Sequence, residues 1–384
     1  MIRSKIRRAR SVLSRPYDVY NRIEVSRSAL LHNADFFRRT TGHTVIPVLK
    51  GNAYGHGITQ VATALKGQHF PYVAVDGYFE ALKVREVVSR QPVLVMGMIK
   101  PHNFAKLRLR GLTFVVQDEA TLRALAQLNK RVKVHLELNT GMNRYGIRPD
   151  ELDNYLHLLQ AAPRLQLEGV MTHLADSDGA TTSNIEQAVR AYDAAVDTIL
   201  SQGFTPRYFH VSQSAGSVRA KSRHANAIRV GIGLYGINPF PIGHPSHSKC
   251  KELRPALKLV STISKVQILK PGDKVSYNYT FTAKKAMRIG ILPLGYHEGV
   301  QRALSNIGVV KVGNGFVPIV GRVCMNHTMI DITEQDLKDG AEVTVYSNVT
   351  DDPNSIESIA HEHDLFTYSL LTGLSPDVRR YLVE

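Results

Sequence analysis

A lysine at the end of a buried apolar run is the most informative residue of this chain. The run 44–49 has the length and composition of a buried strand, and Lys50 follows it directly, ahead of a glycine-punctuated turn. Burial disfavours the charged form of an amine, so a lysine in such a place is expected to have a specific function. One such function is covalent, because a lysine amine can hold an aldehyde cofactor as a Schiff base. The alternative is a strand-end lysine that extends to solvent.

Four more chemically useful side chains fall at related places further along the chain. Arg144 follows the fifth apolar run and His173 ends the sixth. Ser214 follows the seventh run, and Arg229 lies in the eighth. If these runs are the strands of a barrel, their C-terminal ends meet at one rim, where the active sites of such barrels lie. A solvated surface would scatter these residues, so their placement predicts a site.

Eight short apolar runs, most of them separated by a helical pattern, supply the elements that position these residues. This alternation is typical of a (β/α)8 TIM barrel. A doubly wound open sheet is the alternative, but eight evenly placed strands favour closure. The predicted strands are 44–49, 72–75, 92–96, 112–116, 132–138, 165–173, 207–212 and 227–230. The predicted helices are 58–65, 78–88, 118–128, 151–159 and 185–200.

Beyond about residue 241 the pattern changes to long alternating runs, which predict a mostly antiparallel β domain. A proline- and glycine-rich stretch at 239–245 marks the linker. We therefore expect an α/β chain with a basic arm at 1–20, a (β/α)8 barrel at 21–241 and a C-terminal β domain at 242–384. The alternating runs are 257–269, 274–282, 288–292, 309–312, 316–332 and 342–346, with one helical segment at 353–359.

Composition limits the class of protein. With 384 residues and 43% hydrophobic side chains the chain can form two domains with large cores. No apolar run reaches the ~20 residues that a membrane span needs. Only two cysteines occur, which fits a protein of the reducing cytoplasm and not a disulfide framework.

The net charge of +15 raises the question of an anionic partner. Part of the excess lies in the first fifteen residues, which carry Arg3, Lys5, Arg7, Arg8, Arg10 and Arg15. This stretch lacks the apolar segment of a secretory signal, and it reads as a disordered basic arm or an organellar transit peptide. Because no nucleic-acid-binding motif is present, we give nucleic acid little weight. The remaining charge is a solvated surface or attracts a cofactor phosphate and carboxylate substrates.

The stretch 48–57, VLKGNAYGHG, resembles the pyridoxal phosphate signature of the alanine racemase family. The resemblance covers nearly the whole chain after the first ~20 residues. Each further match is short, but their order and spacing together are specific. They are TGMNR (140–144), MTH (171–173), SQSA (212–215), RVGI (229–232), VSY (275–277), GY (295–296), GRVCM (321–325), and Tyr368 ahead of LTG (371–373).

The resemblance implies pyridoxal 5'-phosphate as the cofactor, bound through Lys50. Barrels often bind phosphate with the loops after strands seven and eight. Here the implied phosphate ligands are the Ser214 hydroxyl, the backbone N–H groups of Gly231 and Ile232, and the hydroxyls of Tyr54 and Tyr368. Each tyrosine could instead be a core residue with a satisfied hydroxyl.

The resemblance also places Arg229 against the pyridine nitrogen. A guanidinium does not surrender its proton, so the ring nitrogen would stay largely unprotonated. The cofactor would then be a weaker electron sink, which disfavours side reactions such as transamination. An arginine that is merely ion-paired at the barrel rim is the alternative.

Racemisation needs chemistry on both faces of the substrate α-carbon. The resemblance implies that Lys50 serves one face and that Tyr277, from the other subunit of a homodimer, serves the second. His173, linked to Arg229, would help the tyrosine act near neutrality, although a lone histidine ending a strand is more often structural.

Arg144 and the Met325 backbone N–H are the implied ligands of the substrate carboxylate. Tyr296 and Tyr368 would narrow the mouth of the site and favour small amino acids. The implied reaction interconverts L-alanine and D-alanine and supplies D-alanine for peptidoglycan.

Several positions depart from the family pattern. Glu137 stands where many members carry a carbamylated lysine, whose anion holds the arginine that corresponds to Arg144. The glutamate is already an anion, so we hypothesise that it holds Arg144 without modification. The other departures are Asn139, Asn326, His297 with Glu298, and Asn278. They surround the substrate, so they bear on specificity more than on cofactor binding.

Four other functions stay open. A broad-specificity amino-acid racemase would act on lysine, arginine or serine. A barrel decarboxylase or aldolase could use the same cofactor, since fold does not fix reaction. A pyridoxal phosphate carrier of the single-barrel kind is disfavoured by the β domain with Tyr277. A basic binding protein would use the N-terminal arm and bind nucleic acid in a salt-dependent way.

Overall fold

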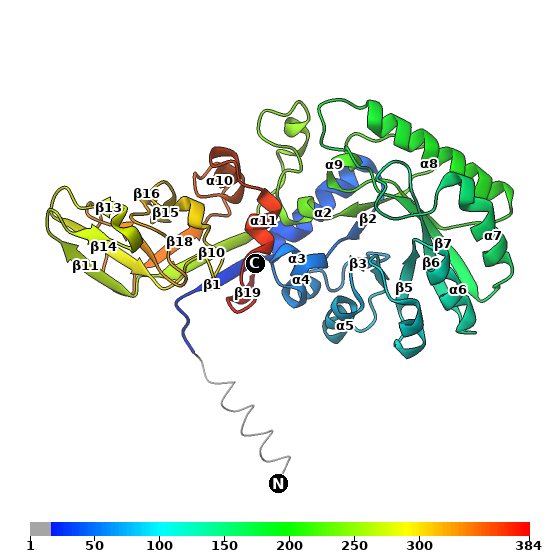
Figure 1. Ribbon diagram of the computed structural model, residues 1–384, viewed down its shortest axis with the longest axis horizontal. Coiled ribbons are helices and arrows are strands. Elements are labelled where there is room, and N and C mark those ends of the chain that lie inside the picture. The colour runs from blue at the N-terminus through cyan, green and yellow to red at the C-terminus, as the bar shows by residue number, and fades with distance from the viewer. Residues whose placement is uncertain (1–16) are drawn as a thin grey trace, which may run out of the picture. The chain divides into compact units, whose positions relative to one another are not determined.

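The computed structural model describes residues 17–384, which divide into two compact bodies (Figure 1). The barrel body comprises Ile23–Lys258 and Tyr346–Glu384. The β body comprises Leu259–Val345 together with the described residues before Ile23. This division differs from the predicted boundary at 241/242, because residues 242–258 and the last segment, 346–384, both belong to the barrel body. Most of the predicted basic arm lies outside the described residues.

The barrel has the eight parallel strands that the sequence predicts. Strands β3 to β8 hydrogen-bond in chain order, and β2 pairs with β9. Two backbone bonds join these sheets: Leu49 N donates to the Ala74 carbonyl at 2.7 Å, and Asn226 N donates to the Phe209 carbonyl at 3.0 Å. The strands are β2 (Thr44–Pro47), β3 (Val73–Val75), β4 (Val93–Val95), β5 (Leu112–Val116), β6 (Val132–Leu138), β7 (Leu165–Thr172), β8 (Tyr208–His210) and β9 (Ala227–Val230).

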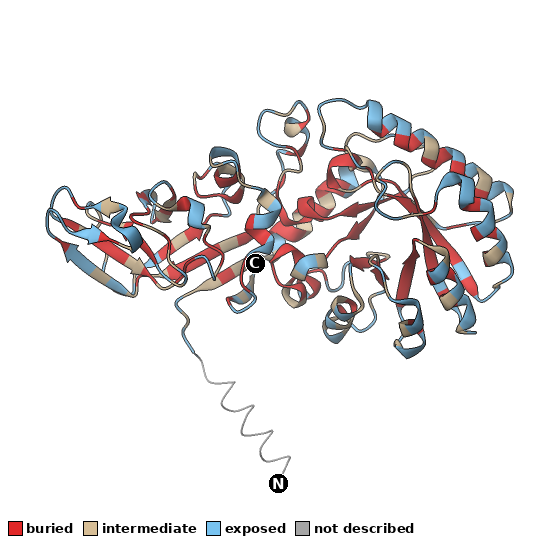
Figure 2. Cartoon of the chain, in the orientation of Figure 1, coloured by how far each residue is buried: buried red, intermediate tan, exposed pale blue. Residues whose placement is uncertain are grey.

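The barrel strands are continuous apolar runs because parallel strands are covered on both faces. All five residues of β5 are buried, and Figure 2 shows the barrel strands almost entirely in the buried colour. Burying one valine, leucine or phenylalanine side chain stabilises a fold by roughly 1.5–3 kcal/mol. The strands therefore form a rigid frame that fixes the residues at their ends.

Amphipathic helices follow the strands on the outside of the barrel (Figure 1). In α8 the buried residues Ile185, Val189 and Tyr192 recur at helical spacing. The Asp118 carboxylate begins α6 by accepting from Thr121 N at 2.7 Å. Across residues 17–384 no helix has the length and apolarity to cross a bilayer. The helices are α2 (Arg27–Thr41), α4 (Ile58–Ala64), α5 (Tyr78–Val87), α6 (Glu119–Gln127), α7 (Leu152–Gln160) and α8 (Ser183–Ser201), with short turns α3 (Lys50–Tyr54) and α9 (Ser214–Ser217).

The β body is mostly antiparallel, as predicted. Strands β16, β15, β18 and β10 are neighbours in one sheet, and β11, β14 and β17 form a second. The predicted runs 257–269 and 316–332 each split into two strands. A core that includes Leu269, Met287 and Met329 fills this body. The strands are β10 (Leu257–Thr262), β11 (Lys265–Leu269), β12 (Lys274–Val275), β13 (Phe281–Thr282), β14 (Met287–Leu292), β15 (Val309–Val312), β16 (Gly315–Pro318), β17 (Thr328–Asp331) and β18 (Glu342–Tyr346).

The C-terminal segment packs on the barrel body next to the Lys50 turn. It forms α10 (Ile356–Glu362), α11 (Thr367–Thr372) and β19 (Arg379–Val383), and β19 lies beside β1 (Arg22–Ser26). The Arg380 guanidinium donates to the Gly55 carbonyl at 3.0 and 3.1 Å. A Cβ at Gly55 would lie 2.0 Å from the Leu371 carbonyl oxygen, so only glycine lets α11 approach this closely. This contact brings Tyr368 of α11 to the barrel rim.

Candidate active site

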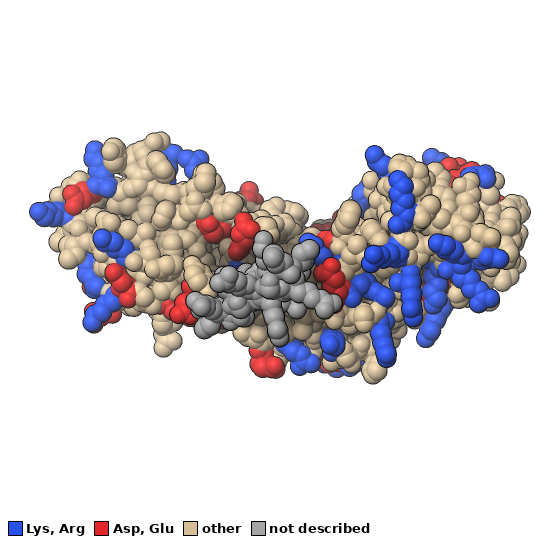
Figure 3. Space-filling model, turned by 90° about the horizontal axis from the view of Figure 1, so that it is seen from below, with Lys and Arg blue, Asp and Glu red and all other residues tan. Residues whose placement is uncertain are grey.

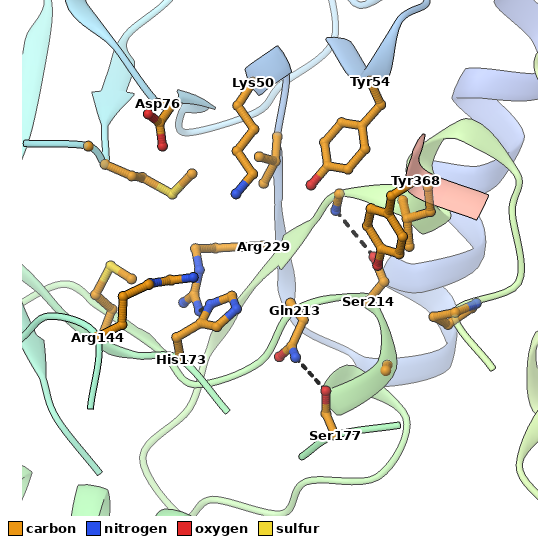
Figure 4. Close-up of a pocket in the computed structure, with 18 of the residues that line it drawn as sticks. Lys50, Tyr54, Asp76, Arg144, His173, Ser177, Gln213, Ser214, Arg229 and Tyr368 are labelled. Atoms are coloured by element: carbon orange, nitrogen blue, oxygen red, sulfur yellow. Dashed lines mark hydrogen bonds between the residues drawn. The ribbon is translucent and has the colours of Figure 1, made fainter. Parts of the chain in front are cut away.

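One cavity opens at the C-terminal ends of the barrel strands, with a volume of about 370 Å³. It lies wholly within the barrel body. Figure 4 shows several of its side chains converging from different strands. Nine of the eleven predicted site residues line it: Lys50, Tyr54, Arg144, His173, Ser214, Arg229, Gly231, Ile232 and Tyr368. The other two, Tyr277 and Met325, belong to the β body.

A left-handed turn begins directly after Lys50. Gly51, Asn52, Ala53 and Tyr54 all have φ between 51° and 63°. For residues with a Cβ this conformation costs roughly 1–2 kcal/mol each. Local bonds hold it: Ala53 N donates to the Leu49 carbonyl at 2.9 Å, and the Asn52 side chain accepts from Ile58 N at 3.0 Å. Strain of this kind persists where surrounding structure enforces it, which is common at functional sites.

Glu80 of α5 anchors this turn from the neighbouring loop. One carboxylate oxygen accepts from Gly51 N at 2.8 Å, and the other accepts from Asp76 N at 3.0 Å. The same carboxylate therefore fixes the loops after β2 and β3. Glu80 was not among the predicted site residues, because its position near a helix start reads only as a capping signal.

Donor groups for an anion gather around Ser214. Its hydroxyl accepts from the backbone N–H groups of Gly231 and Gly233, both at 3.2 Å (Figure 4 draws the first). A Cβ at Gly231 would lie 2.5 Å from the Tyr54 hydroxyl, so any larger residue here would displace that hydroxyl. Burial raises the pKa of Tyr54 far above its ordinary value and, with the Asp178 carboxylate, that of Tyr368 to about 12. Both hydroxyls therefore stay protonated and can donate.

Arg229 is buried at the floor of the cavity, with 3% of its surface exposed. Its guanidinium donates to the carbonyls of Thr172 at 2.6 Å and His210 at 2.7 Å, and to His173 Nδ1 at 3.4 Å. Burial lowers its pKa to about 10, which Glu137 partly opposes, so it remains a cation near neutrality. Burial, and then the charges of Arg229, Arg144 and Lys50, lower the pKa of His173 to about 3. His173 is therefore neutral and accepts at Nδ1, which leaves its proton on Nε2.

A buried pair of histidines continues from Arg229 into the barrel. Arg229 donates to His210 Nδ1 at 2.8 Å, and His210 Nε2 lies 2.8 Å from His135 Nδ1. Because arginine only donates, His210 carries its proton on Nε2 and gives that hydrogen bond to His135. Both residues were missed as site residues, although a histidine inside an otherwise apolar strand run is itself a signal.

Arg144 and Glu137 also line the cavity. Glu137 is 5% exposed, and its carboxylate accepts from Gln117 Nε2 at 2.5 Å. Gln117 in turn donates to the Met96 carbonyl at 3.1 Å. Arg144 is exposed, and within residues 17–384 no hydrogen bond or ion pair joins it to Glu137, so its guanidinium is available to an incoming carboxylate.

Family models and individual relatives agree on the class of protein. The model of the alanine racemase N-terminal domain matches residues 25–239, and that of the C-terminal domain matches 256–382. A protein named alanine racemase from Sorangium cellulosum is 32% identical over 94% of this chain and 99% of its own.

The chain belongs to the alanine racemase family.

Solved alanine racemases have the same fold. The structure from Clostridium difficile 630 has a TM-score of 0.87 at 27% identity and covers 96% of this chain and 97% of its own. A Bacillus anthracis alanine racemase solved with bound L-Ala-P has a TM-score of 0.84 at 29% identity, covering 96% of both chains. The similarity therefore spans both bodies of the chain.

The β body of this alanine racemase family member presents the two remaining predicted residues on its surface. Tyr277 is 69% exposed and Met325 is 54% exposed. Tyr277 lies in a tight turn in which Ser276 and Asn278 have positive φ values of 64° and 59°. The Ser276 hydroxyl holds this turn by donating to the Arg322 carbonyl at 2.7 Å. An exposed phenol on a constrained turn is available to another chain.

Other polar residues of the cavity were not predicted. Gln213 Nε2 donates to the Leu174 carbonyl at 3.2 Å and to the Ser177 hydroxyl (Figure 4), while its Oε1 is buried without a partner among the described residues. Asp76 and Asp178 also line the cavity. These residues lie on loops, where residue type alone does not separate a site from solvated surface.

Proposed function

We propose that this chain is a pyridoxal 5'-phosphate-dependent alanine racemase that interconverts L-alanine and D-alanine and supplies D-alanine for peptidoglycan. The observation that carries this proposal is that Lys50, Ser214 and Arg229 line one cavity at the C-terminal ends of the barrel strands, in a chain of this family. The two free cysteines suit a reducing cytoplasm, where we expect the enzyme to act.

The cavity fits the cofactor in its chemistry. The Ser214 hydroxyl, the N–H groups of Gly231 and Ile232, and the hydroxyls of Tyr54 and Tyr368 would hold a phosphate. Lys50 would hold the cofactor through its amine. The buried Gln213 Oε1 has no donor among the described residues, so it could accept a hydrogen bond from the cofactor. The bound cofactor supplies an electron-withdrawing ring that loosens the hydrogen on the substrate α-carbon.

Arg229 sets how strongly the ring can withdraw electrons. Its pKa of about 10 keeps the guanidinium charged near neutrality, so it would donate a hydrogen bond to a ring nitrogen of the cofactor without transferring a proton. Backbone carbonyls and His210 fix its orientation. With the cofactor bound, Arg229 would therefore disfavour side reactions that need a long-lived carbanion, such as transamination.

Two groups move the α-hydrogen, one on each face of the substrate. The Lys50 amine takes or returns it on one face, and we infer that Tyr277 of the partner subunit in a homodimer acts on the other. The neutral His173 has its Nε2 hydrogen free to stabilise the tyrosine in its ionised form, since Nδ1 accepts from Arg229. Arg144 and the Met325 backbone N–H would bind the carboxylate and fix the α-carbon between the two bases.

The test is conversion of L-alanine to D-alanine by the purified protein with added pyridoxal phosphate. We expect wild type to interconvert the enantiomers. Lys50→Ala and Tyr277→Phe should each lose at least ~10²-fold in kcat, because each removes an acid–base group. The matched controls are Lys66→Ala and Tyr381→Phe, which lie outside the cavity and should retain activity. Cofactor binding without turnover of alanine by wild type would contradict the proposal.

The second candidate is a broad-specificity racemase on the same scaffold. Three carboxylates, those of Asp76, Glu137 and Asp178, line the cavity, more than alanine requires. They would suit a substrate with a cationic side chain. Comparing kcat/KM for alanine with that for lysine, arginine and serine separates the two functions, and Asp178→Asn should selectively weaken lysine turnover only under the second.

A further inference from the structure

A second cavity lies at the opposite end of the barrel from the cofactor cavity. Its volume is about 1200 Å³, and it is lined by residues at or just before the starts of strands β3 to β8. We call it the basic hollow. The N-terminal face of such a barrel usually contributes stability and not catalysis, so the proposed racemase activity does not account for this cavity.

The charge of the basic hollow is strongly one-sided. Six basic side chains and one acidic side chain line it, whereas the whole chain has 48 basic and 33 acidic residues. The one acid, Glu168, is 6% exposed and is neutralised by Lys133 at 2.5 Å. Among the described residues the other five cations have no acidic partner, so their charge is directed to solvent. They are Arg110, Lys130, Arg131, Arg164 and Arg207.

The arginines repeat with the strands. Arg131, Arg164 and Arg207 stand immediately before β6, β7 and β8, and Arg110 stands two residues before β5. Adjacent strands lie ~4.8 Å apart, so the four arginines start along an arc of about 15 Å. Figure 3 shows how densely Lys and Arg gather over the barrel body. Such an arc matches a ligand that repeats its negative charges.

Two of these side chains are held in place. Arg164 Nη1 donates to the Asn129 carbonyl at 2.5 Å, and the Arg207 guanidinium lies 5.3 Å from the centre of the Tyr208 ring. Less side-chain freedom is then lost when an anion binds. The planar guanidinium fork also matches phosphate oxygens better than an ammonium does.

Size and shape favour a phosphate chain over the other anions. The cavity is larger than the ~300–1,000 Å³ of ordinary small-molecule pockets, and it is concave, unlike a surface that lies against a membrane. The half-buried ring of Phe70 lines the cavity and offers a face on which a base can stack. We propose that the basic hollow binds the sugar-phosphate backbone of single-stranded nucleic acid, independently of the cofactor cavity.

Fluorescence anisotropy with a labelled oligouridylate of about 20 nucleotides tests this proposal on the full chain. With five cations engaged, the logarithm of the association constant should fall with log salt at a slope of about −3.5. Arg131→Gln with Arg207→Gln should weaken binding at least tenfold and reduce the slope by about 1.4. The control pair Lys83→Gln with Arg190→Gln removes the same charge from exposed sites outside the hollow and should leave the slope unchanged.

Thermal unfolding midpoints report whether each variant is folded, and Arg110→Gln with Arg131→Gln replaces the first pair if that pair unfolds. Equal binding by hollow and control variants would overturn the proposal. So would loss of all binding on deleting residues 1–15, which would assign it to the arm. Tighter binding of duplex RNA, polyglutamate or anionic vesicles than of the oligonucleotide would overturn it as well.

Discussion

Each buried charge of the cavity has a fixed neighbour. The Arg229 guanidinium reaches three backbone carbonyls, and Glu137 receives the Gln117 amide. Hydrogen bonds of this kind offset the loss of water around a buried charge. The sequence predicts Arg229 because an arginine interrupts an apolar run. It does not predict Gln117, because only the fold brings the end of β5 beside the end of β6.

Glu137→Gln tests whether the native carboxylate takes the place of the family's carbamate. We expect the KM for alanine to rise roughly tenfold, because the hypothesis makes this carboxylate the anion that positions Arg144 once substrate binds, while the cofactor dissociation constant changes by less than about twofold. Steady-state kinetics and cofactor titration measure the two quantities. Glu362→Gln, an exposed change of the same chemistry, is the control. Unchanged KM and cofactor affinity in Glu137→Gln would refute the role.

Buried histidines predict how stability depends on pH. Burial lowers the pKa of His56 to about 4 and, aided by Arg229, that of His135 to about 3. The folded protein therefore binds these protons more weakly than the unfolded chain, whose histidines titrate near ~6.5. Their contribution to stability is complete above about pH 6.5 and is lost as the pH falls toward 3 to 4. Each adds a slope of about 1.4 kcal/mol per pH unit in that window.

His135→Gln should reduce this acid slope, because the amide oxygen can still accept from His210 without titrating. Urea unfolding midpoints between pH 4.5 and 7.5 measure the effect, with the exposed His361→Gln as the control. An acid slope equal to that of wild type in His135→Gln would contradict the assignment of a neutral buried His135.

At the scale of elements, the strands and the position of the turn after Lys50 were predictable, but the conformation of that turn was not. The eight barrel strands follow from buried apolar runs, and the predicted and observed bounds of β5, β6 and β9 agree. The left-handed conformation of Ala53 and Tyr54 has no local signal, since residues of these types rarely adopt it. Besides its local bonds, the turn is held by Glu80 of α5, which accepts from the backbone N–H of Gly51. Long-range bonds of this kind are not written in local sequence.

Glu80→Gln tests the anchor of this turn. The amide would direct one NH2 group at backbone N–H donors that now face a carboxylate oxygen, so we expect a loss of roughly 1–3 kcal/mol in unfolding free energy. Cofactor affinity should fall as well, because the turn carries Lys50. Denaturant unfolding and cofactor release measure the two effects. Glu86→Gln, exposed on the same helix, is the control, and equal stability of both variants would exclude the anchoring role.

At the scale of the whole molecule, the position of a segment in the sequence does not predict which of the two bodies it packs on. Residues 346–384 read as the end of the β domain, yet α11 and β19 pack on the barrel body through Gly55 and Arg380. Helical periodicity predicts that α10 exists but not which core it covers. Tyr368 therefore lines the cavity of its own barrel body, whereas Tyr277 is exposed on the β body.

The proposed homodimer makes a quantitative prediction about mixed dimers. Lys50→Ala and Tyr277→Phe chains, differently tagged and co-expressed, are purified through both tags. If Tyr277 of the partner subunit completes each site, one site of the mixed dimer carries both changes and the other carries neither. The mixed dimer should then show about half the wild-type activity, although both parent dimers are inactive. A dimer of two differently tagged Lys50→Ala chains, purified in the same way, measures any activity from contaminating host racemase. If each chain instead used its own Tyr277, every site would lack one base, and the Lys50→Ala/Tyr277→Phe dimer would stay as inactive as its parents.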